Sequence, residues 1–181
     1  MSDRTRRTRR WVDARAAHPS TPWIGLVIRL VLGGFILWAS LAKLTDPYAS
    51  VVSVRAYDLL PEPLVKLVGY SLPVVELLVA LCLLLGLITR VTAVFAAGLM
   101  VVFVIGIASV WARGMEIDCG CFGSGGPQPG ASSKYPWEIA RDVGFFLMAG
   151  WLFLWPRTRY ALDNLLFPRT LERIPDAEEV R

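Results

Sequence analysis

Charge and histidine are both scarce in this sequence. Charged residues make up 19% of the 181 residues, against 55% hydrophobic residues, and this balance excludes both an ordinary soluble domain and a disordered chain. The single histidine, His18, excludes histidine-based metal sites and a Ser-His or Cys-His nucleophile. Three cysteines are too few for a disulfide scaffold. These absences leave a small integral membrane protein built as one domain.

Four apolar runs account for most of the chain, at residues 24–44, 67–88, 91–111 and 137–155. As helices they would be roughly 28 to 33 Å long, enough to cross a hydrocarbon core of about 30 Å. Backbone groups in lipid must satisfy their own hydrogen bonds, and short alternating segments typical of a barrel are missing. The sequence therefore predicts an all-α fold, a polytopic membrane four-helix bundle whose partner is the lipid bilayer.

Basic residues predict the orientation. Eleven of the 19 Lys and Arg residues lie in the two tails, 1–22 and 157–181, which flank the predicted membrane domain at 23–156. The positive-inside rule places both tails in the cytoplasm and the protein in the plasma membrane as a multi-pass protein. The tails also account for the net charge of +4, and no nucleic-acid-binding module is recognisable.

Two segments are then expected on the outer side, and they differ in kind. The first begins with Asp46-Pro47, an N-cap followed by proline at the first helical position, which predicts a short helix on the membrane surface. Pro61 and Pro63 are expected to end this helix. The second, at 113–135, is rich in glycine and proline, which predicts an irregular loop without helix or strand.

A resemblance to a known family rests on the motif in this second segment. Asp118-Cys119-Gly120-Cys121-Phe122-Gly123 resembles the Cys-Gly-Cys-Phe-Gly signature of the MauE family, which is related to the DoxX-like membrane proteins. Other matching features are Lys43-Leu44 with Asp46-Pro47, Leu72-Pro73 with Glu76, and Arg141, whereas Ser40 replaces an expected glycine. The resemblance covers about residues 25–155. It implies a four-helix bundle with an accessory role in redox maturation of an exported protein, as in methylamine dehydrogenase maturation.

Cys119 and Cys121 are the candidate redox pair. One glycine separates them, so a disulfide would close a small strained ring, and strained exposed disulfides are the more oxidising ones. The alternatives are a structural disulfide or thiols without a role, and two cysteines alone make a poor metal site. Cys82 lies too deep in the second predicted helix to reach the pair, and is interpreted as a small buried hydrophobe.

Two intramembrane charges, Arg29 and Glu76, are expected to form a buried ion pair that fixes helix register. The alternative is that Glu76 is a proton-relay or quinone-side carboxylate. Nearer the outer boundary, Lys43 and Arg141 are candidates to stabilise a cysteine thiolate or to bond a quinone carbonyl, with Arg141 also bonding Glu138. Plain salt bridges among interface charges are the alternative for this second group.

These observations favour a membrane thiol-disulfide oxidoreductase. It would exchange thiols or electrons with an exported thioredoxin-like protein or a maturing redox enzyme subunit. Membrane quinone as the final acceptor rests on a fold-level analogy with DsbB and vitamin K epoxide reductase, which use a second cysteine pair that this chain lacks. The other hypothesis is a non-catalytic membrane assembly factor for an exported redox protein.

Overall fold

The computed structural model describes residues 21–121, 125–156, 158 and 161–162. Most of the two predicted tails, and Phe122 and Gly123 of the cysteine motif, lie outside the described residues. The described elements are α2 (Thr21–Thr45), α3 (Pro47–Ala56), α4 (Glu62–Leu85), α5 (Thr89–Ala112), β1 (Ile117–Cys119), β2 (Gly125–Pro127), the 3-10 turn η1 (Ala131–Ser133) and α6 (Tyr135–Leu154). The predicted all-α class is confirmed.

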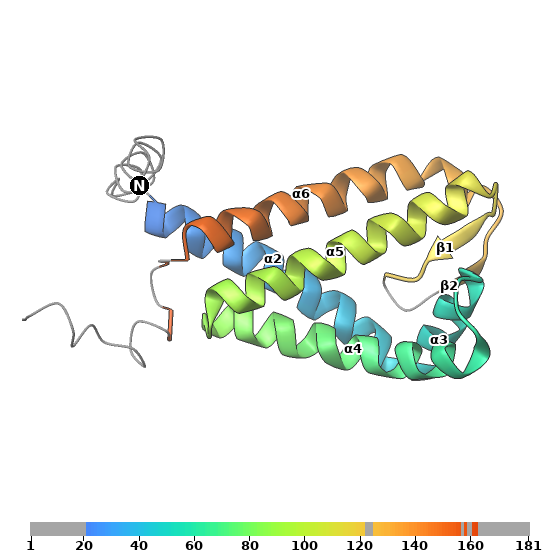
Figure 1. Ribbon diagram of the computed structural model, residues 1–181, viewed down its shortest axis with the longest axis horizontal. Coiled ribbons are helices and arrows are strands. Elements are labelled where there is room, and N and C mark those ends of the chain that lie inside the picture. The colour runs from blue at the N-terminus through green and yellow to red at the C-terminus, as the bar shows by residue number, and fades with distance from the viewer. Residues whose placement is uncertain (1–20, 122–124, 157, 159–160, 163–181) are drawn as a thin grey trace, which may run out of the picture.

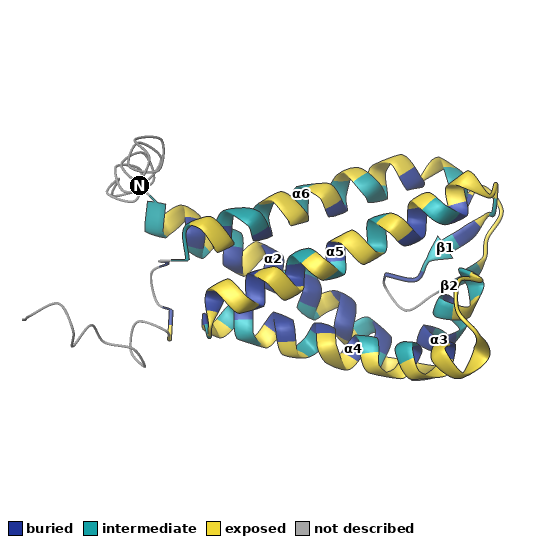
Figure 2. Cartoon of the chain, viewed as in Figure 1, coloured by how far each residue is buried: buried dark blue, intermediate teal, exposed yellow. Residues whose placement is uncertain are grey.

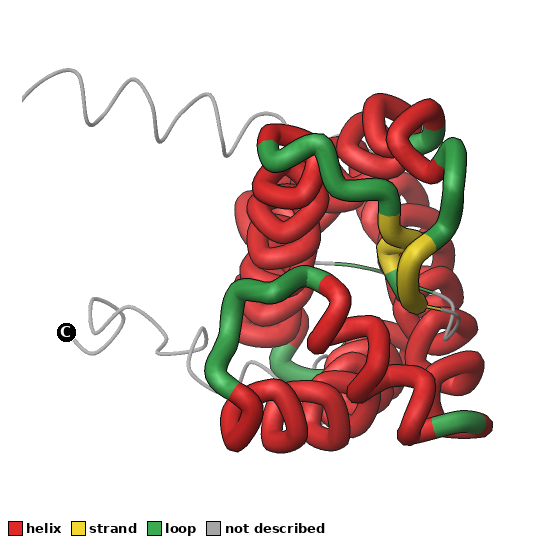
Figure 3. The backbone as a smooth tube through the Cα atoms, turned by 90° about the vertical axis from the view of Figure 1, so that its right-hand side faces the viewer, coloured by secondary structure: helices red, strands yellow, loops and turns green. Residues whose placement is uncertain are grey.

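The four long helices run along the length of the molecule (Figure 1). Helix α2 packs mainly on α4, and α5 mainly on α6, so the bundle consists of two helix pairs with smaller contacts between them. Helix α3 and the strands gather at one end, while the beginning of α2 and the end of α6 lie at the other. Viewed from the first end, the strands lie between the helix pairs (Figure 3).

Exposed apolar residues cover the outside of the bundle (Figure 2). The core consists of buried residues that include Leu32, Leu83, Ala93, Met100 and Leu152. Helices α2, α4 and α5 are long and apolar enough to cross a membrane, so a membrane protein is supported by composition and by burial pattern. Helix α6 carries Glu138, Arg141 and Asp142 in its first two turns, and its crossing stays a prediction.

The second long helix begins five residues earlier than predicted, because the prolines that were expected to end the surface helix start α4 instead. Pro61 is the N-cap of α4 and Pro63 lies in its first turn, where an N–H group needs no helical acceptor. The helix ends at Leu85, since Gly86 takes a left-handed conformation with φ of 68°. Its predicted range of 67–88 is therefore shifted at both ends.

The surface helix starts where its capping residues predicted. The side chain of Asp46 accepts a hydrogen bond from the Ala49 amide at 3.0 Å, and Pro47 occupies the first turn. Helix α3 then folds back onto α4, where the Ser50 hydroxyl donates to the Gly69 carbonyl at 2.9 Å. A Cβ atom on Gly69 would come within 2.7 Å of the Val51 backbone, so glycine permits this close approach.

The segment at 113–135 was predicted to lack helix and strand, and this was wrong. Strands β1 and β2 form an antiparallel pair with Ile117 opposite Pro127 and Cys119 opposite Gly125. The Tyr135 hydroxyl holds β1 by accepting from the Ile117 amide at 2.9 Å. Strands of three residues are too short to show an alternating pattern, and the tyrosine that bonds β1 is the first residue of α6.

Candidate functional site

Glu76 pairs with Lys43, not with Arg29 as the sequence predicted. Lys43 Nζ donates to Glu76 Oε1 at 2.6 Å, and the two side chains are only 4% and 2% exposed. The reason is the placement of α3: the first turns of α4 pack on α3, so α4 begins beyond the end of α2. This offset brings Glu76 level with Lys43, near the end of α2.

Arg29 instead lies at the opposite end of α2, about 21 Å along the helix from Lys43. Its Nη1 atom donates to Thr158 Oγ1 at 2.8 Å, and the side chain is 1% exposed. A Cβ atom on Gly86 would come within 2.1 Å of this guanidinium. Arg29 therefore joins the residues that follow α6 to the turn between α4 and α5, and is not part of the cysteine site.

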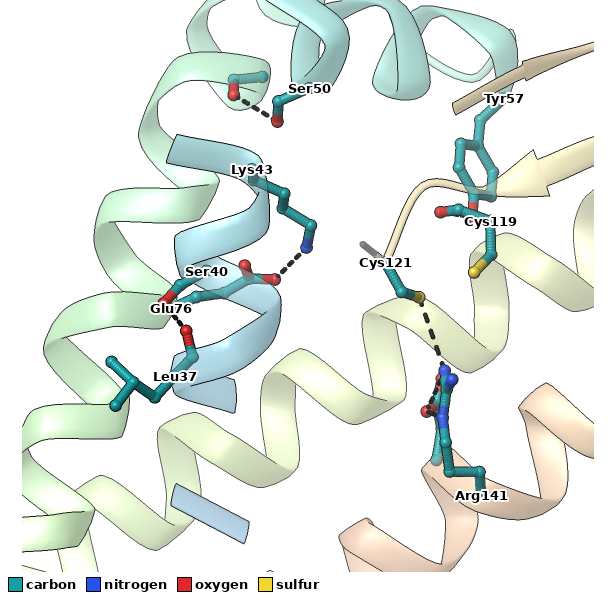
Figure 4. Close-up of polar contacts among 11 residues, drawn as sticks. Leu37, Ser40, Lys43, Ser50, Tyr57, Glu76, Cys119, Cys121 and Arg141 are labelled. Atoms are coloured by element: carbon teal, nitrogen blue, oxygen red, sulfur yellow. Dashed lines mark hydrogen bonds and ion pairs between the residues drawn. The ribbon is translucent and has the colours of Figure 1, made fainter. Parts of the chain in front are cut away.

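Cys119 and Cys121 lie at the end of the bundle that also contains α3 (Figure 4). Both are free thiols, and their side chains lie close enough for each to shift the pKa of the other. Gly120 between them has φ of 66°, and a Cβ atom there would come within 2.5 Å of Ser53. Glycine therefore serves both the backbone conformation and the close seating of the loop on α3. The Tyr57 hydroxyl also secures the loop by donating to the Cys119 carbonyl at 2.9 Å.

Arg141 lies directly beneath Cys121, the position that the sequence predicted for it. Its Nη2 atom is 3.6 Å from Cys121 Sγ, and its guanidinium lies over the Phe35 ring at 5.2 Å. Arg141 Nε donates to Asp142 Oδ1 at 2.9 Å, a partner that the sequence did not predict. Asp142 is 1% exposed, and a buried carboxylate without a cationic partner is strongly destabilising. The bond from Arg141 provides that partner.

The two thiols differ in exposure and in acidity. Cys121 is 6% exposed, whereas Cys119 is only partly buried. Interaction with the neighbouring Cys119 thiol lowers the pKa of Cys121, and the Arg141 charge lowers it further. Interaction with Cys121 raises the pKa of Cys119, and burial raises it further. A negative charge on the pair therefore resides on Cys121.

Glu138 is a contact of Cys119 that the sequence did not reveal. Its carboxyl group lies near the Cys119 thiol, and its charge raises the pKa of that thiol. Spacing along α6 had associated Glu138 with Arg141, and nothing local indicated that the preceding loop folds back over this turn. Each cysteine thus has its own partner from α6: Glu138 beside Cys119, and Arg141 beside Cys121.

A small space lies between the Lys43–Glu76 pair and the Arg141–Asp142 pair. Its lining includes Lys43, Glu76, Cys121, Arg141 and Asp142, and its volume of about 10 Å³ is of the order that one water molecule occupies. Glu76 Oε2 and Asp142 Oδ2 are buried and accept no hydrogen bond from the described residues. Lys43 and Arg141, the two predicted thiolate stabilisers, therefore approach the same space from α2 and α6. Across the described ranges, no group of three or more His, Cys, Asp and Glu residues is placed to hold a metal ion.

Comparison with known proteins agrees with the resemblance seen in the motif. The family described as "Methylamine utilisation protein MauE" matches residues 21–155. A curated relative, "Methylamine utilization protein MauE" from Paracoccus denitrificans, is 36% identical over 109 residues, which cover 60% of this chain. The match spans 59% of the relative's length. No solved structure matches the chain.

The Lys43–Glu76 pair yields a prediction for stability. Lys43→Met should lower the free energy of unfolding by about 3–5 kcal/mol, because it leaves a buried carboxylate without its partner. Adding Glu76→Met should recover part of that loss, with a coupling energy of about 1 kcal/mol or more. Denaturant titration in detergent micelles measures both. Arg29→Met is the matched control, and its effect on the free energy of unfolding should add to that of Glu76→Met. A coupling energy between Arg29 and Glu76, and none between Lys43 and Glu76, would contradict the pairing.

The contact between Arg141 and Cys121 yields a prediction for pH dependence. The Arg141 charge lowers the pKa of Cys121, so Arg141→Gln should raise that pKa and slow alkylation near neutral pH roughly tenfold. Arg141→Lys should recover part of the rate, because it keeps the charge without the planar fork. The measurement is the pH dependence of Cys121 alkylation by a small reagent in reduced membranes, followed by mass spectrometry.

Arg55→Gln is the control for this measurement, since Arg55 forms an exposed pair with Glu62 away from the thiols. It should leave the alkylation profile unchanged. A profile for Arg141→Gln that coincides with the parent profile would show that Arg141 forms only a structural salt bridge with Asp142.

Proposed function

Because the chain belongs to the MauE family of methylamine utilisation proteins, we propose that it is a membrane thiol-disulfide oxidoreductase. It accepts two electrons, through Cys119 and Cys121, from an exported thioredoxin-like protein or from a maturing redox enzyme subunit. The family membership and the three apolar helices support a membrane protein of this kind. The exchange chemistry and the partner are the proposal.

The asymmetry of the cysteine pair is the observation that carries the proposal. Thiol-disulfide exchange needs one sulfur that a partner can reach and another that leaves readily as a thiolate. Cys119 is the more accessible sulfur, and Cys121 is buried 3.6 Å from the Arg141 guanidinium. A structural disulfide would not require a cation beside one of its two sulfurs.

The proposed reaction proceeds in two displacements. A partner thiolate attacks Cys119 Sγ of the oxidised pair, the Cys119–Cys121 bond breaks, and Cys121 leaves as a thiolate beside Arg141. A second partner thiolate then attacks the partner sulfur of the mixed disulfide, and Cys119 leaves and takes up a proton. Glu138, whose carboxyl group lies near Cys119, is placed to supply that proton. The partner becomes a disulfide, and its two electrons remain on the reduced Cys119–Cys121 pair.

The proposal places the cysteine loop outside the plasma membrane and both termini in the cytoplasm. The beginning of α2 and the end of α6 lie at one end of the bundle, opposite the loop (Figure 1), which supports a common side for the two termini. The basic residues in the tails support the assignment of that common side to the cytoplasm. An oxidising exterior is also where a disulfide on this loop would persist.

The relative's name connects the proposal with methylamine utilisation. On this view the chain contributes to methylamine metabolism by oxidising cysteines in an exported protein as that protein matures. Membership in the family is equally compatible with a non-catalytic assembly factor that holds the maturing protein at the membrane. The two hypotheses differ in whether Cys119 and Cys121 are required.

Trapping with a defined dithiol protein tests the exchange. Oxidised protein in detergent should form a mixed disulfide with reduced thioredoxin whose second active-site cysteine is replaced by serine, and mass spectrometry should place the bond on Cys119. Cys82→Ser is the matched control and should react like the parent, whereas Cys119→Ser should lower the yield at least about tenfold. An adduct on Cys121, or no adduct, would contradict the proposal. A second test replaces the MauE of Paracoccus denitrificans with the Cys119→Ser/Cys121→Ser variant of this chain. Full growth of these cells on methylamine would favour the assembly factor.

Labelling of intact cells tests the orientation. After mild reduction, a membrane-impermeant maleimide should label Cys119 from outside and leave Cys82 unlabelled, because Cys82 lies near the far end of α4, about 30 Å along the helix from Glu62. Permeabilised cells provide the comparison. Cys119 that reacts only after permeabilisation would reverse the proposed orientation.

A further inference from the structure

A larger cavity opens beside the cysteine loop, among α3, α4 and α5. Its volume is about 280 Å³, near the lower end of the range for ligand pockets. The apolar lining includes Leu72, Val102, Phe103 and Ile105, and the polar side chains of the lining are those of Lys43, Ser50, Ser53, Tyr57 and Cys119. A space of this kind suits a compact apolar ring that carries a polar group.

The cavity can be entered from the lipid. Val102 and Ile105 lie in α5, which is apolar enough to span a membrane, and are 60% and 61% exposed. Leu59, on the other side of the lining, is 51% exposed. These exposed apolar residues at the edge of the cavity provide a route for a lipid-soluble molecule, and room for an apolar tail to extend into the bilayer.

Lys43 is the side chain of the lining best placed to donate a hydrogen bond to a bound molecule. Three of the polar residues have hydroxyl groups that already donate to backbone carbonyls: Ser50 to Gly69, Ser53 to Ala49, and Tyr57 to Cys119. The Lys43 ammonium has three hydrogens and uses one of them on Glu76. Figure 4 shows it directed toward the space between α2 and the cysteine loop. The ligand should therefore present an acceptor oxygen.

The proposed exchange leaves two electrons on Cys119 and Cys121 in each cycle, and these must reach another acceptor. Cys82 cannot serve, because it lies in the last turn of α4, near the opposite end of the bundle. We propose that the cavity binds the head group of a membrane quinone, which reoxidises the Cys119–Cys121 pair while Lys43 donates a hydrogen bond to a quinone carbonyl. This inference rests on the proposed function and names its electron acceptor.

The reaction balances with one quinone per cysteine pair. The Cys119 thiol and the Cys121 thiolate lose one proton and two electrons as the Cys119–Cys121 bond forms. The quinone takes up these two electrons, that proton and a second proton from water to become a hydroquinone. Cys119 is the sulfur that lines the cavity. A lipid acyl chain is a poorer occupant, because it offers no acceptor oxygen to a buried ammonium group.

Photolabelling tests the site independently of thiol chemistry. An azido analogue of a short-chain ubiquinone should label the Cys119→Ser/Cys121→Ser protein in lipid nanodiscs, at residues around the cavity, and excess decylubiquinone should compete. Val102→Trp should reduce the labelling at least tenfold by filling the cavity. Val94→Trp is the matched control and should leave the labelling unchanged, because Val94 is an exposed valine of α5 outside the lining.

Thiol counting tests the electron transfer. Reduced parent protein should lose the Cys119 and Cys121 thiols as one decylubiquinone is reduced per molecule, and Val102→Trp should slow this reaction while Val94→Trp does not. The inference would be overturned if the protein is not labelled, or if decylubiquinone does not compete with the label. It would also be overturned if the two tryptophan variants have equal effects, or if the thiols persist in the presence of quinone. Because the photolabelled variant has no loop thiols, failure of this site is distinguishable from failure of the exchange, which the thioredoxin adduct reports separately.

Discussion

Burying charge inside an apolar bundle is the constraint on which the rest of this structure depends. Lys43, Glu76 and Asp142 are almost completely buried, and Arg141 is buried in part. An unpaired charge in this setting costs several kcal/mol, and Lys43 and Arg141 each meet a carboxylate. Lys43–Glu76 links α2 to α4, and Arg141–Asp142 lies on α6. The two ion pairs line a common small space. Their contacts constrain how the two helix pairs pack against each other.

The cysteine loop completes this arrangement from the end of the bundle. Tyr57 and Ser53 of the α3 region seat the loop, and Gly120 permits the close approach. The loop consequently delivers Cys121 to Arg141 and leaves Cys119 beside Glu138. Two residues that are nearly adjacent in sequence thus acquire different electrostatic surroundings, and the proposed division between an attacked sulfur and a leaving thiolate follows from that difference.

Helix α3 has a structural role that exceeds its length. By packing on the first turns of α4 it displaces α4 relative to α2, and by contributing Ser50, Ser53 and Val54 it forms one wall of the larger cavity. The same element therefore determines which basic residue meets Glu76, and it forms part of the ligand-sized space next to Cys119. In a MauE-family protein, the bundle end containing α3 and the loop is where both the proposed exchange and the proposed quinone site are found.

Local pattern was enough to predict the helices, because apolar run length and the Asp46-Pro47 cap act within one segment. It also placed Arg141 near the cysteines, since the loop leads directly into α6. Local pattern did not predict the partner of Glu76, the bond from Arg141 to Asp142, the contact of Glu138 with Cys119, or the three-residue strands. The contacts of Arg141 and Glu138 and the pairing of the strands depend on how the cysteine loop folds onto α6. The partner of Glu76 depends on how far α4 is displaced along α2. That displacement results from packing between residues distant in sequence, such as Ser50 against Gly69, and only the tertiary structure specifies it.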